Sequence, residues 1–306
     1  MELAVLDLGS TTFHLQHFQV DANGGLTSTL DLKDNVSLGA KVFPSGHIDP
    51  QARALALASV DQLMAASNQR GFTQRAIVAT SAIRSAENGR VLTRAIEARH
   101  DSPVAILEPR EEARLAYLGQ LGTPEVSGKR FAMVDLGGGS VELSVGRDLQ
   151  PLFTESLPLG AIRMAAAGSG DLGAQLREPL QAIARLEPEL IVFGSGSARA
   201  ARKLLLGAKT GSFTTEAFRS ELHALARHTP AQLIALGVES ARAGTVLTSA
   251  TIMLQILELL GAPQAFVSDR GLRHGVASEL WRHLTRQSGV FRSAAAPSGS
   301  LLVEAN

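Results

Sequence analysis

The chain of 306 residues contains no cysteine and few aromatic side chains, and these absences exclude several classes of protein. Without cysteine there is no disulfide scaffold, no thiolate metal site and no cysteine nucleophile. The single Trp and single Tyr leave few aromatic faces on which nucleic-acid bases could stack. The 29 basic residues are balanced by 29 acidic ones, which argues against a broadly basic, nucleic-acid-binding surface. A local cationic pocket remains compatible with this balance.

Long hydrophobic runs are also missing. The longest apolar stretch, residues 246–260, is interrupted by Thr, Ser, Gln and Glu, and it is too short and too polar to cross a bilayer. The first seven residues contain Glu2 and Asp7 and lack the basic start of a signal peptide. We therefore expect a cytoplasmic protein with no membrane partner and no nucleic-acid partner.

The residues that are present predict an α/β protein of about two domains. Short apolar runs alternate with helical patterns along most of the chain, as in α/β folds. The expected strands are residues 3–8, 13–20, 76–80, 104–107, 131–136, 141–145, 190–193 and 265–267. The expected helices are residues 50–70, 87–99, 109–119, 174–186, 197–206, 215–227, 230–236, 241–260 and 272–286. The Ser-, Ala-, Gly- and Pro-containing end, residues 288–306, is expected to be a flexible tail.

An internal repeat divides the chain. Leu6-Asp7-Leu8-Gly9-Ser10 is matched, 128 positions later, by Val134-Asp135-Leu136-Gly137-Gly138. Each copy has the pattern of a strand ending in Asp, a Gly-rich turn and a second strand. We therefore expect one domain over residues 1–124 and another over 125–306, with a cleft lined by one turn from each.

The two turns are candidate phosphate-binding loops. Backbone N–H groups of a Gly-containing turn can converge on one anion, hydroxyl groups add donors, and an Asp before the turn can hold a divalent cation. Three consecutive glycines imply either left-handed backbone or close approach of a ligand to the backbone. The alternative interpretation of each turn is a tight hairpin capped by Asp and Ser. The candidate residues are Gly9, Ser10, Thr11, Gly137, Gly138, Gly139 and Ser140.

Other segments carry weaker signals. No Walker A loop is present, and Gly194-Ser195-Gly196-Ser197 fails the dinucleotide fingerprint because Arg199 stands at its third small position. A helix start at that point could bind phosphate, although helix capping is the favoured interpretation. Glu111 and Glu112 lie in the first turn of an expected helix, where the helix dipole favours acidic residues. Helix stabilisation alone can therefore explain them. The arginines on later expected helices are interpreted as exposed, at positions 199, 202, 227, 242, 282 and 286.

Taken in order, these motifs resemble the exopolyphosphatase/guanosine pentaphosphate phosphohydrolase family. The resemblance continues through residues 79–84, 111–115, 157–163, 194–196 and 271–275, over about 280 residues of the chain. It implies the short form of that family, with two ribonuclease H-like domains of the actin/sugar-kinase/Hsp70 superfamily and an interdomain cleft. It also implies release of orthophosphate from the end of inorganic polyphosphate, with guanosine pentaphosphate as an alternative substrate and a homodimer as a candidate assembly.

The resemblance implies a role for each matched residue. Asp7 and Asp135 would hold Mg²⁺, the two turns would cradle the phosphates, Arg84 would face them, and Glu112 would be the general base for water. Phosphoryl transfer depends on positioning, charge neutralisation and an oriented nucleophile, which these groups could supply. Burial near phosphate is expected to raise the pKa of Glu112.

The chain departs from the family pattern at four places, namely Glu108-Pro109, Thr11, Val141 and His274. None of them is a residue expected to hold metal or activate water, so they bear on substrate preference. A kinase or ATPase using the same cradle, and a polyphosphate or alarmone sensor with little catalysis, are the rival interpretations. Zero net charge favours short chains held end-on.

Overall fold

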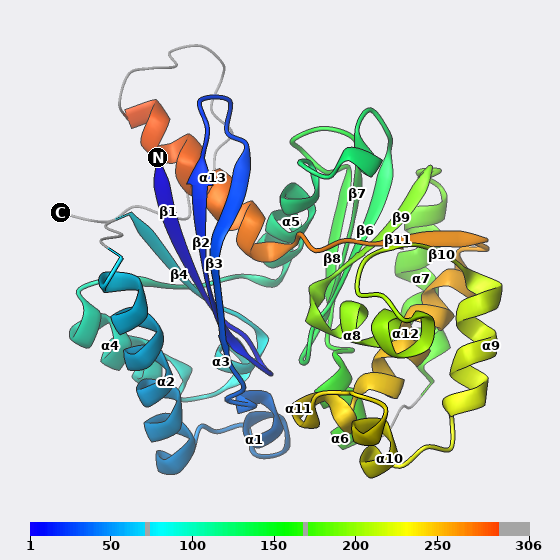
Figure 1. Cartoon of the computed structure of the whole chain (residues 1–306), viewed down its shortest axis with the longest axis horizontal. Helices are drawn as coiled ribbons and strands as arrows, with labels where there is room; N and C mark the ends of the chain where they lie inside the picture. Colours follow the sequence, from blue (N-terminus) through cyan, green and yellow to red (C-terminus); the bar gives the residue numbers. More distant parts are fainter. Residues whose placement is uncertain (71–73, 168–170, 288–306) are drawn as a thin grey trace.

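The computed structural model describes residues 1–70, 74–167 and 171–287, which form two mixed sheets with helices packed on them. Figure 1 shows the two sheets side by side, the first in blue and cyan and the second mostly in green, with its strand β11 in orange. The expected tail, residues 288–306, lies outside the described residues. Among the helices that are described, none is both long and apolar enough to span a bilayer.

The first sheet has the strand order β3-β2-β1-β4-β5. Its strands are β1 (Glu2–Leu8), β2 (Phe13–Val20), β3 (Leu26–Asp34), β4 (Arg75–Ala79) and β5 (Val104–Ile106). The first three are antiparallel neighbours, whereas β1, β4 and β5 run parallel. Its helices are α1 (Leu38–Ser45), α2 (Pro50–Asn68), α3 (Ser81–Ser85) and α4 (Gly89–His100). Asp49 caps α2 by accepting a hydrogen bond from the Ala52 N–H at 2.7 Å.

The second sheet repeats this topology with one additional edge strand, in the order β10-β11-β9-β6-β7-β8. Its strands are β6 (Phe131–Leu136), β7 (Val141–Gly146), β8 (Phe153–Leu157), β9 (Leu190–Gly194), β10 (Gly211–Thr214) and β11 (Gln264–Val267). Its helices are α6 (Ala161–Ala167), α7 (Leu172–Ala184), α8 (Ser195–Leu206), α9 (Thr215–Leu225), α10 (Pro230–Ala235), α11 (Ser240–Ala243) and α12 (Val246–Leu259). Strands β6, β9 and β11 run parallel, so the sequence repeat corresponds to a repeated sheet.

Two helices, α5 (Pro109–Gln120) and α13 (Leu272–Gln287), pack against each other between the sheets. Glycines permit this contact, because a Cβ at Gly119 would overlap the carbonyl oxygen of Gly271, and a Cβ at Gly275 that of Leu115. Although α13 comes last in the sequence, it also packs on β1 of the first sheet (Figure 1). The division into residues 1–124 and 125–306 stays a prediction.

Within the described residues, one hydrophobic cluster lies in each half and a third joins them. Strands β1 and β6 are almost wholly buried, as expected for central strands that are covered on both faces. The joining cluster combines Leu3 and Val5 with Phe131 and Met133 of the other sheet. The core therefore holds the two Gly-rich turns in a fixed relation.

Candidate functional site

The β1–β2 and β6–β7 turns are built alike. The Gly9 N–H donates to the Thr12 carbonyl at 3.2 Å, and the Gly137 N–H donates to the Ser140 carbonyl at 2.9 Å. None of the glycines of either turn has the left-handed backbone that only glycine adopts freely. Left-handed backbone therefore does not explain these glycines, which leaves the close approach of another group to the backbone.

Backbone N–H groups at the first residues of two helices hold both turns by hydrogen bonds. In the first half, the Gly39 N–H at the start of α1 donates to the Ser10 carbonyl at 2.8 Å. In the second half, the Ile162 N–H at the start of α6 donates to the Gly138 carbonyl, also at 2.8 Å. Because these carbonyl oxygens are satisfied by the helices, each turn is held in one position.

The two turns meet each other, as the repeat predicted. A Cβ at Gly138 would lie 2.7 Å from the Thr11 Oγ1, and one at Gly139 would lie 2.9 Å from the Ser10 Oγ. A larger residue at either position would have to displace these side chains. The glycine run thus permits close approach between the two halves of the molecule, whereas the sequence had suggested close approach of a ligand.

Four carboxyl groups line one part of the cavity between the turns: Asp7, Glu112, Asp135 and Glu142. Burial raises the pKa of Asp7, against the opposing effect of Arg273, whose Nη1 donates to the Asp7 Oδ2 at 3.1 Å. Burial raises the pKa of Asp135 to about 6, where Arg199 lowers it and the charge of Asp7 raises it further. These carboxyl groups are therefore crowded together, and burial outweighs the arginines that lie beside them.

Glu112 lies in the first turn of α5 and is buried. The Arg84 Nη1 donates to its Oε2 at 2.6 Å and to the Leu107 carbonyl at 2.7 Å. Burial raises the pKa of Glu112 to about 7, with Arg84 opposing the rise and the charges of Asp7 and Asp135 adding to it. Arg84 thus contacts the Glu112 carboxylate and is not among the residues that line the cavity; its contact with phosphate stays a prediction.

Glu142 was not singled out from the sequence, although it faces the same cavity. It pairs directly with Asp135 across the β6–β7 hairpin, and the Ser156 Oγ donates to its Oε1 at 2.8 Å. Burial, followed by the charges of Glu112 and Asp135, raises its pKa well above the ordinary value. The signal that could have found it is the hairpin register, because a strand residue opposite Asp135 shares its face of the sheet.

A second part of the cavity is basic, with Lys33, Arg199, Arg242, Arg270 and Arg273 along its wall. The interpretation of Arg199 and Arg242 as exposed helix faces was wrong, since both line this cavity and are only partly exposed. Burial lowers the pKa of Arg199 to about 10, and the neighbouring Arg273 and Arg242 add to that effect through their charges, against the opposing charge of Asp135. The sequence could not reveal this, because the two arginines come from separate helices.

Among the described residues, no group of three or more His, Asp or Glu side chains is arranged to hold a metal ion alone. Mg²⁺, however, usually takes only one or two carboxylates and completes its shell with water and substrate phosphate. Asp7 and Asp135 fit this use, because both line the cavity and the buried Asp7 Oδ1 has no hydrogen-bond partner. A divalent cation would add counter-charge beside Asp135 and at the Asp7 Oδ1, while the Asp7 Oδ2 is already paired with Arg273.

The site can be compared with known proteins. Over 299 residues the chain is 26% identical to exopolyphosphatase 1 of Mycobacterium tuberculosis, an alignment that covers 90% of this chain and 87% of the relative. A solved exopolyphosphatase from Cytophaga hutchinsonii has a TM-score of 0.82 at 22% identity, covering 94% of this chain and 98% of that one. The Aquifex aeolicus member of the Ppx/GppA family has a TM-score of 0.76 at 23% identity, covering 92% and 98%.

These similarities confirm the expected fold class, an α/β protein, here with two mixed sheets of similar topology. The family model that matches spans residues 18–283, from strand β2 to helix α13, and so includes Glu112, Asp135 and the second Gly-rich turn. The resemblance drawn from the motifs is thereby confirmed, and this chain belongs to the Ppx/GppA phosphatase family.

Proposed function

We propose that the protein is an exopolyphosphatase, which hydrolyses the terminal phosphoanhydride bond of inorganic polyphosphate and releases orthophosphate. The observation that carries the proposal is the buried Glu112, which faces a cavity lined by both Gly-rich turns and by two further carboxyl groups suited to Mg²⁺. The relatives named exopolyphosphatase support the same activity.

In the proposed reaction, the turn N–H and hydroxyl groups of Ser10, Thr11 and Ser140 hold the terminal phosphate. Asp7 and Asp135 would hold Mg²⁺, which when bound would neutralise charge on the phosphates. Glu112 orients a water molecule and accepts its proton as the water oxygen bonds to the terminal phosphorus. The bridging P–O bond breaks, orthophosphate is released, and the polyphosphate leaves one phosphate shorter. Arg84 keeps the Glu112 carboxylate in place through its 2.6 Å contact.

The decisive variant is Glu112→Gln, which preserves shape but removes the base. We expect phosphate release to fall by at least about 100-fold while polyphosphate binding persists, because the phosphate-binding groups are untouched. Glu111→Gln is the matched control, since Glu111 is the adjacent carboxyl on α5 but pairs with Arg114 outside the cavity. Wild-type turnover in Glu112→Gln would refute the assignment.

Assays with different substrates distinguish the rival functions. Phosphate release is measured from tripolyphosphate, long polyphosphate, ATP and guanosine pentaphosphate, each with Mg²⁺ and with chelator. Transfer of phosphate from ATP to an acceptor would indicate a kinase, and tight binding without release over hours would indicate a sensor. Release from guanosine pentaphosphate in preference to polyphosphate would favour the alternative substrate. A cytoplasmic location and a homodimer belong to the same proposal.

A further inference from the structure

A second cavity adjoins the first along α8 and the segment between α10 and α11. The two cavities share Lys33, Gly196, Arg199 and Arg242, and the second adds Lys203 and Lys209. None of the four carboxyl groups of the first cavity lines the second. The four shared residues are therefore the junction between the cavity that holds the carboxyl groups and the second cavity.

The second cavity concentrates positive charge in a protein whose formal net charge is zero. Three of the five lysines of the chain, Lys33, Lys203 and Lys209, line it together with two arginines. Its single acidic residue, Glu239, already lies 3.5 Å from Arg242. A cavity with this excess of cations favours an anionic ligand.

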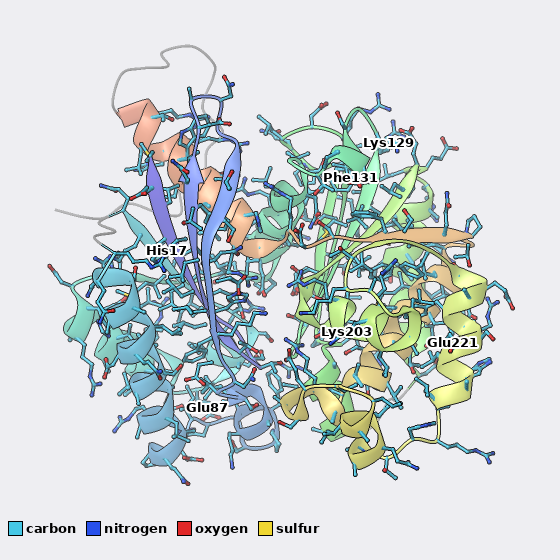
Figure 2. The ribbon with its side chains drawn as sticks, viewed as in Figure 1. His17, Glu87, Lys129, Phe131, Lys203 and Glu221 are labelled. Atoms are coloured by element: carbon cyan, nitrogen blue, oxygen red, sulfur yellow. The ribbon has the colours of Figure 1, made fainter. Side chains whose placement is uncertain are left out.

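The two added lysines are available for such a ligand. Lys203 and Lys209 are both exposed, and within the described part of the chain neither side-chain ammonium group makes a hydrogen bond or an ion pair. Crowding is visible at the junction, where burial and the neighbouring cations lower the pKa of Arg199. Figure 2 places Lys203 on α8, well away from Lys129 at the other end of the second half.

The remaining lining indicates which anion fits. The uncharged side chains of the cavity are small or aliphatic, among them Ala200, Leu204 and Val238, and no aromatic side chain lines it. Stacking of a nucleobase relies mainly on aromatic faces, which this cavity lacks. Flexible lysines, in contrast, act as point charges that suit successive phosphates of a linear chain.

We propose that this second cavity binds the inner phosphates of a linear polyphosphate whose terminal phosphate lies among the carboxyl groups of the first. The inference rests on the proposed function. It gives the bound polyphosphate a direction, from Glu112 past Arg199 and Arg242 to Lys203 and Lys209. Chains long enough to reach the two lysines bind more tightly than tripolyphosphate. The expectation of end-on binding is retained, but the preferred substrate is longer than the shortest chains.

The test is the double variant Lys203→Ala/Lys209→Ala, assayed with tripolyphosphate and with polyphosphate of several tens of phosphates. We expect the KM for the long substrate to rise about tenfold, and its dependence on salt to weaken, while the KM for tripolyphosphate changes less than twofold. Lys203→Arg/Lys209→Arg should retain most of the affinity for long chains. Lys41→Ala/Lys129→Ala is the matched control, because both of these lysines are exposed and line neither cavity.

Equal changes for short and long substrates, or no change for either, would overturn the proposal. So would weaker binding of a guanosine nucleotide with unaltered binding of polyphosphate, which would make the cavity a nucleoside site. If the wild-type protein releases no phosphate from any polyphosphate, the proposed function fails by itself. Titration calorimetry with long polyphosphate then still decides on the cavity, by comparing the Kd of the wild type with that of the double alanine variant.

Discussion

Glu112 and Arg84 form a pair whose chemistry depends on pH. Glu112 must be ionised to accept a proton from water, yet burial raises its pKa to about 7. We therefore expect kcat/KM for polyphosphate to rise with pH on an acidic limb that ends near neutrality. Initial rates between about pH 5.5 and 9 measure this limb. A rate that is already constant from the acidic end of that range would contradict the assignment of Glu112 as the base.

A substitution of Arg84 tests whether the ionisation of Glu112 causes the acidic limb of the pH profile. Its guanidinium opposes the rise in the pKa of Glu112, by charge and by a hydrogen bond. Arg84→Met should therefore move the acidic limb to higher pH in addition to lowering the rate. A variant that only loses rate, with its pH profile unmoved, would show that Arg84 has no effect on the ionisation of Glu112.

At the scale of single elements, the contact between α5 and α13 sets the position of Glu112. Gly275 allows the backbones to touch, because a Cβ there would overlap the Leu115 carbonyl. Gly275→Ala should lower the free energy of unfolding by about 2 kcal/mol and should also reduce kcat, since α5 carries Glu112. Denaturant unfolding and phosphate release measure the two effects.

The control for this substitution is Gly244→Ala. Gly244 has no heavy atom within 4 Å of the added Cβ and ends the short helix α11 in right-handed conformation. The same change should therefore leave stability and rate close to the wild-type values. If Gly275→Ala behaves like Gly244→Ala, the glycine contact does not hold the helices together.

The elements that the sequence predicted are those with strong apolar periodicity, including the strands before and after both turns. Strand β3 was missed because it is an edge strand with mostly exposed, polar residues such as Thr27 and Ser28. Strand β8 was missed for a similar reason, being partly exposed along its length. The single helix expected over 241–260 is two, since Gly244 and Thr245 interrupt it.

Two of the four carboxyl groups of the site were predictable from the sequence because repeated local motifs mark them. Asp7 and Asp135 stand at equivalent places before their turns, and the cavity between the turns confirms that the repeat brings them together. The basic end was not predictable, because Arg199, Arg242 and Arg273 come from three helices that only the tertiary fold assembles. Charge that is spread along a sequence gives no local pattern to recognise.

At the scale of the whole molecule, Arg163 fastens one half to the other beside the Gly-rich turns. From α6 its Nε donates to the Gly139 carbonyl at 2.9 Å, and its Nη2 donates to the Ser85 Oγ of the first half at 3.1 Å. Its guanidinium also lies 4.0 Å from the centre of the Phe43 ring. One side chain thus joins the second turn to two elements of the opposite half.

Removing this link should loosen the cavity as a whole. We expect Arg163→Ala to lower the free energy of unfolding by about 1–2 kcal/mol and to reduce kcat/KM for polyphosphate, because the facing turns lose a shared anchor. Arg163→Lys should restore little, since lysine cannot make the two forked hydrogen bonds. Arg177→Ala, at an exposed position on α7, serves as the control for loss of one positive charge. If Arg163→Ala and Arg177→Ala give the same stability and the same rate, the two halves are held together by the joining hydrophobic cluster alone, and Arg163 is dispensable for the geometry of the cavity.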